Sequence, residues 1–214
     1  MLDYQTVEPD NLVKFNFLKG HLFYHYIQSI PELLDYDLVT VLRYPVERVI
    51  SLYRFWRLHP PEFTNNKTIH PALRGRVALA KRLTLHEFVS SSEQMIVNSI
   101  CNSQSRQLCS RHIFEDFHEL TAEVIYKDVT GNLNTFTAIG LIEMLPLFYQ
   151  ELHQQFGFHV PDKLLLSNVS DKTEPLWHSA DEYRKIVAKI IELNPVDIKI
   201  YELYRTQQLE RINQ

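Results

Sequence analysis

An arginine and a serine have the types and the spacing that suit binding of a doubly charged anion. Arg43 directly follows a short apolar run, and Ser51 lies further along the same segment, 41–53. A guanidinium is a planar charged fork that matches a phosphate or sulfate group, and a hydroxyl adds a neutral donor. The structural alternative is that Arg43 caps the edge of a sheet and that Ser51 is only tolerated in a helix.

A strand, a turn and a helix are predicted to position these two residues. Residues 38–42 are apolar and rich in β-branched types without a helical period, which is typical of a buried parallel strand. From Pro45 onward the apolar residues recur with helical spacing, at positions 49, 52, 53 and 56. Ligands of α/β proteins bind at the carboxyl ends of parallel strands, where Arg43 stands. Ser51 is expected on the helix face opposite the apolar stripe, towards the ligand.

The rest of the chain is predicted to alternate between helices and short strands within a single domain, residues 1–214. The predicted signals are a helix end at His59-Pro60-Pro61, capping boxes at 84–87 and 179–182, strands at 122–126 and 139–141, a helix end at Gly157 and a helix boundary at Asn194-Pro195. We therefore expect an α/β fold, with a small parallel sheet flanked by helices and a helix-rich C-terminal part.

The composition is typical of a soluble globular protein, with 45% hydrophobic and 22% charged residues. No apolar run approaches the about 18 residues of a transmembrane helix, and no signal-peptide pattern begins the sequence. Cys101 and Cys109 do not make a disulfide framework. We expect a cytoplasmic protein, or a protein of the Golgi lumen if a missing N-terminal segment carries a membrane anchor.

Positive charge is concentrated in one segment, although the net charge of the chain is −4. Residues 43–82 contain nine Lys and Arg residues but only two acidic residues, Glu47 and Glu62. Such a segment can attract an anionic ligand even on an acidic protein, and the alternative is an ordinary solvated basic face.

The segment 41–53 resembles the 3′-phosphate-binding motif of carbohydrate sulfotransferases of the Golgi and bacterial types. These enzymes use 3′-phosphoadenosine-5′-phosphosulfate as sulfate donor, and their motif reads R-D-P-x-x-R-x-x-S-x-Y after an apolar strand. The resemblance implies a P-loop-NTPase-like sulfotransferase fold in which Arg43 and Ser51 bind the 3′-phosphate of the donor. Tyr44 departs from the family, which has Asp there, and this changes the turn but neither binding position.

Further segments are similar to the family in their order and spacing, at 19–21, 102–108, 139–143, 166–170 and 194–201. The first resembles the source of the catalytic base in the heparan sulfate 2-O-sulfotransferase branch, which implies that His21 takes the proton of the acceptor hydroxyl. The fourth resembles a loop that closes near the nucleotide, which implies a binding role for Ser170, with Lys172 in reach of a phosphate. Otherwise His21 is one of ten histidines, packed or exposed beside His25, and Lys172 is a surface lysine.

The expected partners follow from the same resemblance: the nucleotide donor, and a carbohydrate or another hydroxyl compound as acceptor. We expect no metal, because the histidine-rich segments lack a third ligand at a known spacing, and no nucleic-acid partner.

The phosphate loop that would hold the 5′ half of the donor is not found. None of the five glycines stands in a P-K-[TA]-G-[GT]-[TS] or G-x-x-x-x-G-K-[ST] sequence. The chain is therefore expected to lack the first strand and this loop, as an N-terminally truncated form. Three hypotheses remain: a sulfotransferase completed by an upstream segment, a remnant that binds only the 3′-phosphate half of the nucleotide, and a purely helical interaction protein.

Overall fold

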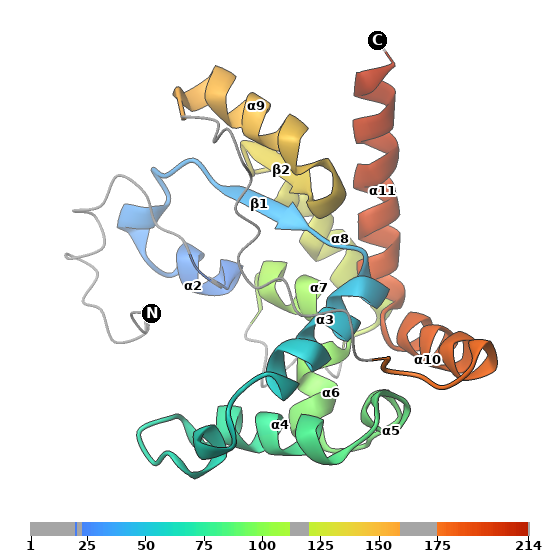
Figure 1. Ribbon diagram of the computed structural model, residues 1–214. Helices are drawn as coiled ribbons and strands as arrows, with labels where there is room; N and C mark the ends of the chain where they lie inside the picture. The colour runs from blue at the N-terminus through green and yellow to red at the C-terminus, as the bar shows by residue number, and fades with distance from the viewer. Residues whose placement is uncertain (1–19, 21–22, 112–119, 159–174, 214) are drawn as a thin grey trace.

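The computed structural model describes residues 20, 23–111, 120–158 and 175–213 (Figure 1). Its helices and strands are, in chain order, α2 (Tyr24–Gln28), β1 (Val39–Leu42), α3 (Pro45–Arg57), α4 (Pro71–Arg82), α5 (Leu85–Val89), α6 (Gln94–Ile100), α7 (Ser103–Leu108), α8 (Ala122–Leu133), β2 (Ala138–Leu141), α9 (Leu145–Phe156), α10 (Ala180–Leu193) and α11 (Pro195–Ile212). Short 3₁₀ helices are η2 (Pro31–Leu33), η3 (Pro61–Asn65) and η5 (Ile142–Met144). The protein is thus an α/β structure dominated by helices.

The sheet in the described part of the chain consists of two of the three predicted strands. β1 and β2 are parallel, with Val39 opposite Ala138 and Leu42 opposite Leu141. α9 packs against β2, and a β-carbon at Gly140 would lie 2.5 Å from the ring of Phe148. Gly140 is therefore needed where this helix approaches the strand. The carboxyl ends of both strands lie at the same edge, as expected for a ligand site.

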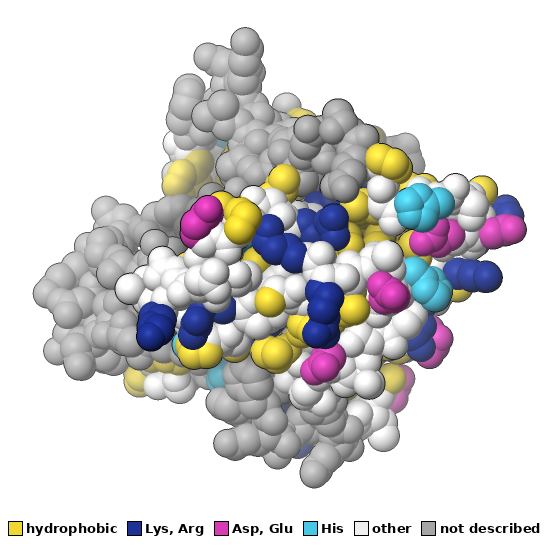
Figure 2. Space-filling view, turned by 60° about the horizontal axis from the view of Figure 1, so that its bottom comes forward, with side chains coloured by type: hydrophobic (Ala, Val, Ile, Leu, Met, Phe, Trp, Pro, Cys, Tyr) yellow, Lys and Arg dark blue, Asp and Glu magenta, His cyan; other side chains and the backbone are white. Residues whose placement is uncertain are grey.

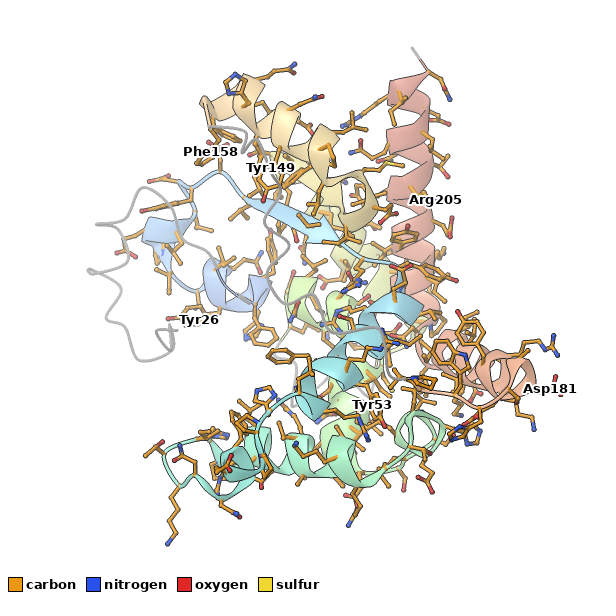
Figure 3. The ribbon with its side chains drawn as sticks, viewed as in Figure 1. Tyr26, Tyr53, Tyr149, Phe158, Asp181 and Arg205 are labelled. Carbon is orange, nitrogen blue, oxygen red and sulfur yellow. The ribbon has the colours of Figure 1, made fainter. Side chains whose placement is uncertain are left out.

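α3 begins directly after β1 and leads into a lower layer of helices (Figure 1). Pro45 occupies its first turn, and the predicted apolar stripe is confirmed in part, because Val49, Tyr53 and Trp56 are buried whereas Leu52 is only partly buried. The Tyr53 hydroxyl donates a hydrogen bond of 2.7 Å to the carbonyl of Leu83, which ties α3 to the end of α4 (Figure 3). The helix is thus anchored along its buried face.

The predicted helix caps are largely confirmed. Thr84 and Glu87 form the complete capping box at the start of α5. Ser179 accepts from the backbone N–H of Glu182, but the carboxylate of Glu182 accepts from the N–H of His178 instead of closing the box. Gly157 ends α9 in the left-handed conformation, with φ of 68°.

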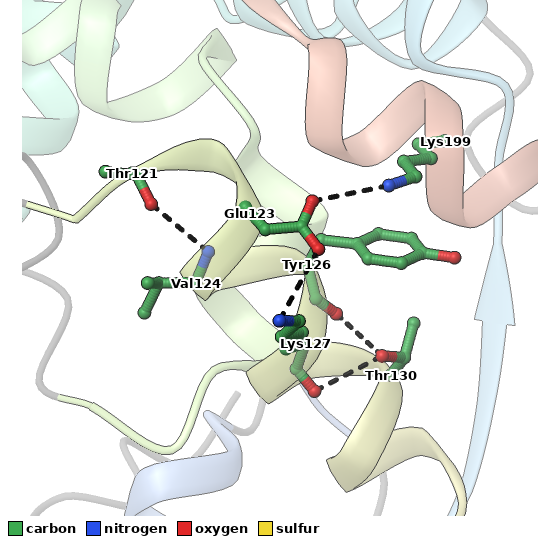
Figure 4. A network of polar contacts seen from close by, with 7 residues as sticks. All are labelled: Thr121, Glu123, Val124, Tyr126, Lys127, Thr130 and Lys199. Carbon is green, nitrogen blue, oxygen red and sulfur yellow. Dashed lines mark hydrogen bonds and ion pairs between the residues drawn. The ribbon is translucent and has the colours of Figure 1, made fainter.

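The strand predicted at 122–126 is wrong, because these residues begin helix α8. Thr121 caps the helix by accepting from the N–H of Val124, and Ile125 and Val129 bury one helical face. Glu123 lies 3.6 Å from Nζ of Lys199, whose ammonium also lies over the ring of Tyr126, so α8 is fastened to α11 (Figure 4). Five residues are too few to distinguish weak alternation from the helical period of about 3.6 residues.

Two main hydrophobic cores meet beside the end of β1. The first is formed by residues of α3, α4, α5, α6 and α10, and the second by residues of β1, α7, α8, β2 and α11. Tyr44, between β1 and α3, packs against both cores. Every helix in the described part of the chain is too short or too polar to cross a membrane.

Candidate anion-binding site

Arg43 lies where β1 ends, as predicted. Its backbone N–H donates to Oε1 of Gln104 at 2.8 Å, and its carbonyl accepts from Nε2 of the same side chain at 2.9 Å. Its side chain is 37% exposed, and the carboxylate of Glu47 lies 3.9 Å from Nε, an ion pair of small energy because Glu47 is exposed. In the described part of the chain, Nε of Arg43 is buried and has no hydrogen-bond partner. The backbone is fixed, whereas the guanidinium keeps donors for a ligand.

Arg48, in α3, carries a second guanidinium, near enough to Arg43 for their charges to interact. Its Nη1 donates a hydrogen bond to Oγ of Ser103. Burial lowers the pKa of Arg48, the Asp197 carboxylate partly offsets this effect, and the positive charge of Arg43 lowers the pKa further. No carboxylate among the described residues lies within ion-pair distance of Arg48. We call Arg43 and Arg48 the arginine pair.

Ser51 lies in α3 and is partly buried. The buried residues of this helix, such as Val49 and Tyr53, define a stripe, and a rotation of about 100° per residue puts Ser51 opposite to it. The predicted orientation is therefore consistent with the burial pattern. Arg48 precedes Ser51 by three residues and so shares a neighbouring part of the same face. Among the residues that the structure describes, no partner accepts from the Ser51 hydroxyl.

A buried polar network lies beneath the arginine pair and consists of Asn102, Gln104, Ser105, Asn194 and Asp197. Asp197 accepts from the N–H of Gln104 at 3.0 Å, and from the N–H and hydroxyl of Ser105 at 2.7 and 2.5 Å. The Asn102 amide oxygen in turn accepts from the N–H groups of Val196 and Asp197 at 3.0 and 3.2 Å. Each of the helices α7 and α11 is thus capped by a side chain from the other, which satisfies N–H groups that a helix start leaves free.

Asn102 adopts a left-handed conformation, with φ of 43°. Asparagine is one of the few residues that tolerate this region, because its short amide compensates locally. Here its own N–H donates to the Asn194 side chain at 2.9 Å. The conformation turns the chain from α6 into α7, and this places the cap for α11.

A second contact connects α11 with the carboxyl ends of the strands. The Tyr201 hydroxyl donates a hydrogen bond to the carboxylate of Glu143, which follows β2. Burial raises the pKa of Tyr201, and the bond to Glu143 raises it further, so the hydroxyl stays protonated. The rings of Tyr44 and Tyr201 lie 5.3 Å apart, which gives Tyr44, the departure from the family motif, a packing role.

Four of the segments that resemble the sulfotransferase motifs therefore meet in space. Segment 41–53 contacts 102–108 through the arginine pair, and 102–108 contacts 194–201 through the polar network. Segment 139–143 joins them through Tyr201. Residues far apart in sequence thus surround one small region at the end of β1.

The structure brings together only part of the predicted site. Arg43 and Ser51 are described, whereas His21, Ser170 and Lys172 lie outside the described residues. Sequence reasoning missed Arg48 and Gln104 as site residues. Arg48 stands in the motif itself, between Arg43 and Ser51, and that position is its signal in the sequence. Gln104 lies in the segment 102–108 that resembles the family, but its contact with Arg43 spans sixty-one positions of sequence, so local spacing did not indicate it.

The wider surface around α4 is also basic. Figure 2 shows several Lys and Arg side chains, with some Asp and Glu between them, on the side of the molecule that faces down in Figure 1. The remaining cations of 43–82 that make no ion pair within the described part of the chain are Arg54, Lys67, Arg74, Arg76, Lys81 and Arg82. Such a surface raises the local concentration of anions near the site.

The two cysteines take no part in this site. Both are free thiols, and burial raises the pKa of Cys109 to about 12, so its thiol is neutral at physiological pH. What the arrangement can do chemically is bind an anion, because two guanidinium groups whose charges interact stand at the end of β1, with Glu47 exposed and Asp197 engaged by Gln104 and Ser105. Comparison of the chain with protein-family models, curated proteins and solved structures found no match.

Proposed function

We propose that this protein is a sulfotransferase that moves a sulfuryl group from 3′-phosphoadenosine-5′-phosphosulfate to a hydroxyl of a carbohydrate. The observation that supports the proposal is the arginine pair at the carboxyl end of β1, where α/β proteins hold nucleotides. In this proposal Arg43 and Arg48 bind the 3′-phosphate of the donor, and Ser51 donates a further hydrogen bond.

The chemistry of the reaction explains why such a site matters. The acceptor oxygen attacks the sulfur, and the bond between sulfur and the 5′-phosphate oxygen breaks. Adenosine 3′,5′-bisphosphate leaves with the electron pair. A fixed 3′-phosphate holds the donor in line with the acceptor, and positioning supplies much of the catalysis in transfers of this kind. The resemblance assigns the acceptor proton to His21, and assigns Ser170 and Lys172 to the nucleotide.

A second candidate is a module that binds the nucleotide without transferring sulfate. The positions of the glycines favour it: Gly75 and Gly131 lie inside helices, Gly140 lies in β2, and Gly157 ends α9. None of these four stands in a loop between a strand and a helix, where a phosphate loop belongs.

Transfer of labelled sulfate from the donor to a panel of glycan acceptors tests the proposal. We expect transfer by the wild type, and a loss of about tenfold or more at subsaturating donor for Arg43→Ala, because a charge-assisted contact is removed. The matched control is Arg205→Ala, since Arg205 is an exposed arginine of α11 paired with Glu202 (Figure 3).

A folded wild type that transfers no sulfate to any acceptor would contradict the enzyme. If that protein still binds adenosine 3′,5′-bisphosphate, the second candidate is the correct one. Equal losses in Arg43→Ala and Arg205→Ala would show that Arg43 has no special role.

A further inference from the structure

The side chain of Gln104 bonds to both the N–H and the carbonyl of Arg43, as the backbone of a neighbouring strand does in a sheet. Its amide accepts from the N–H of Arg43 at 2.8 Å and donates to the carbonyl of Arg43 at 2.9 Å. Two such bonds to one residue restrict both backbone dihedrals of Arg43. They also set the direction in which its side chain leaves the chain.

Gln104 is itself held firmly in place. It is 8% exposed, and its N–H donates to Oδ2 of Asp197. The neighbouring Ser105 donates to the other oxygen of the same carboxylate twice. The start of α7 is thus attached to α11, and an amide that is held in this way can position another residue.

The adjacent residue of α7 reaches the other member of the arginine pair. Oγ of Ser103 accepts from Nη1 of Arg48, and Ser103 is buried. The consecutive residues Ser103 and Gln104 therefore contact both arginines. Ser103 bonds to the guanidinium of Arg48, and Gln104 bonds to the backbone of Arg43. Like charges repel, so the two guanidinium groups favour separation unless something holds them.

We propose that Gln104 is a positioning residue of the anion site, whose amide fixes the backbone of Arg43 so that the two guanidinium groups converge on one phosphate. This inference rests on the proposed function, because it takes the 3′-phosphate of the nucleotide as the ligand. Gln104 itself does not touch the ligand in this arrangement. Its replacement therefore reduces the contribution of the 3′-phosphate to binding and leaves the rest of the nucleotide affinity unchanged.

The chain offers a control in another glutamine whose side chain bonds to the sheet. Nε2 of Gln208, in α11, donates to the carbonyl of Ile139 in β2 at 3.0 Å. This is also a glutamine side chain bonded to backbone at the sheet, but it makes one bond, to β2, where Gln104 makes two, to Arg43. Gln104→Met and Gln208→Met both remove side-chain-to-backbone bonds while keeping side-chain length, and only the first loosens Arg43.

The experiment is titration calorimetry with adenosine 3′,5′-bisphosphate and with adenosine 5′-monophosphate, for the wild type and both variants. The ratio of the two affinities isolates the 3′-phosphate, and a purely structural loss would change both affinities alike. We expect Gln104→Met to lower this ratio about tenfold, because misplacing one charge-assisted contact has that effect. Gln208→Met should leave the ratio within about twofold.

An unchanged ratio in folded Gln104→Met would overturn the inference while the proposed function stands. If the wild type does not bind the bisphosphate, the proposed function itself fails, and the inference fails with it. Should Gln104→Met not fold, Gln104→Glu replaces it, since its carboxylate still accepts from the N–H of Arg43 but no longer donates to the carbonyl. This variant is expected to lower the ratio as well, and a wild-type ratio would again contradict the inference.

Discussion

Replacing Arg48 by methionine is expected to abolish most of the affinity for adenosine 3′,5′-bisphosphate while leaving the free energy of unfolding within about 1 kcal/mol of the wild type. The guanidinium is partly buried, its pKa is lowered by burial and by Arg43, and its hydrogen bond goes to a neutral hydroxyl. Methionine fills a similar volume without requiring solvation of a charge. A variant that keeps its free energy of unfolding but loses its affinity for the nucleotide indicates that the replaced residue serves ligand binding. Calorimetry and urea denaturation measure the two quantities.

Arg57 of the same helix provides the control for this prediction. Its Nη1 donates to the Tyr53 hydroxyl at 3.2 Å, so the evident role of Arg57 is to stabilise the fold through hydrogen bonds within the protein. Arg57→Met should therefore lower the free energy of unfolding and leave the affinity for the bisphosphate unchanged. A destabilised Arg48→Met that binds as tightly as the wild type would contradict the ligand-binding role of Arg48.

Replacing Asp197 by alanine is expected to cost about 3–5 kcal/mol of the free energy of unfolding, the largest effect on stability that we predict. The side chain is 2% exposed and accepts three hydrogen bonds from Gln104 and Ser105. Its removal leaves buried N–H groups without an acceptor and Arg48 without its compensating charge. Urea denaturation of both proteins at the same pH measures the difference.

Asp197→Asn provides a graded comparison, because an amide oxygen can still accept one or two of these bonds. Its expected free energy of unfolding lies between that of the wild type and that of the alanine variant. A loss below about 1 kcal/mol for Asp197→Ala would mean that water satisfies these groups, and the polar network would then not hold α7 and α11 together.

Local signals allowed the strand–turn–helix unit around Arg43 to be predicted from the sequence. The apolar run before Arg43, Pro45 in the first turn and the stripe that follows each act within a few residues. The capping box at Thr84 and the stop at Gly157 are similarly local. Elements of this kind are recognised because nearby residues alone decide their geometry.

Non-local contacts account for what the sequence did not predict. Three contacts connect distant segments. They are the bonds from Gln104 to Arg43, the caps that α7 and α11 supply to each other, and the bond from Tyr201 to Glu143. The first five residues of the helix at 122–133 contain too few apolar positions to define a helical period, so local pattern alone favours a strand there. No rule of local spacing identifies which distant residue completes such a contact.

Titration of the wild type with adenosine 3′,5′-bisphosphate, and in parallel with adenosine 5′-monophosphate, tests the central claim most directly. The arginine pair predicts binding of the bisphosphate at least about tenfold tighter than that of the monophosphate, with an affinity that falls as salt increases. Equal affinities for the two nucleotides, or no binding of either by the folded protein, would contradict a 3′-phosphate site at the end of β1.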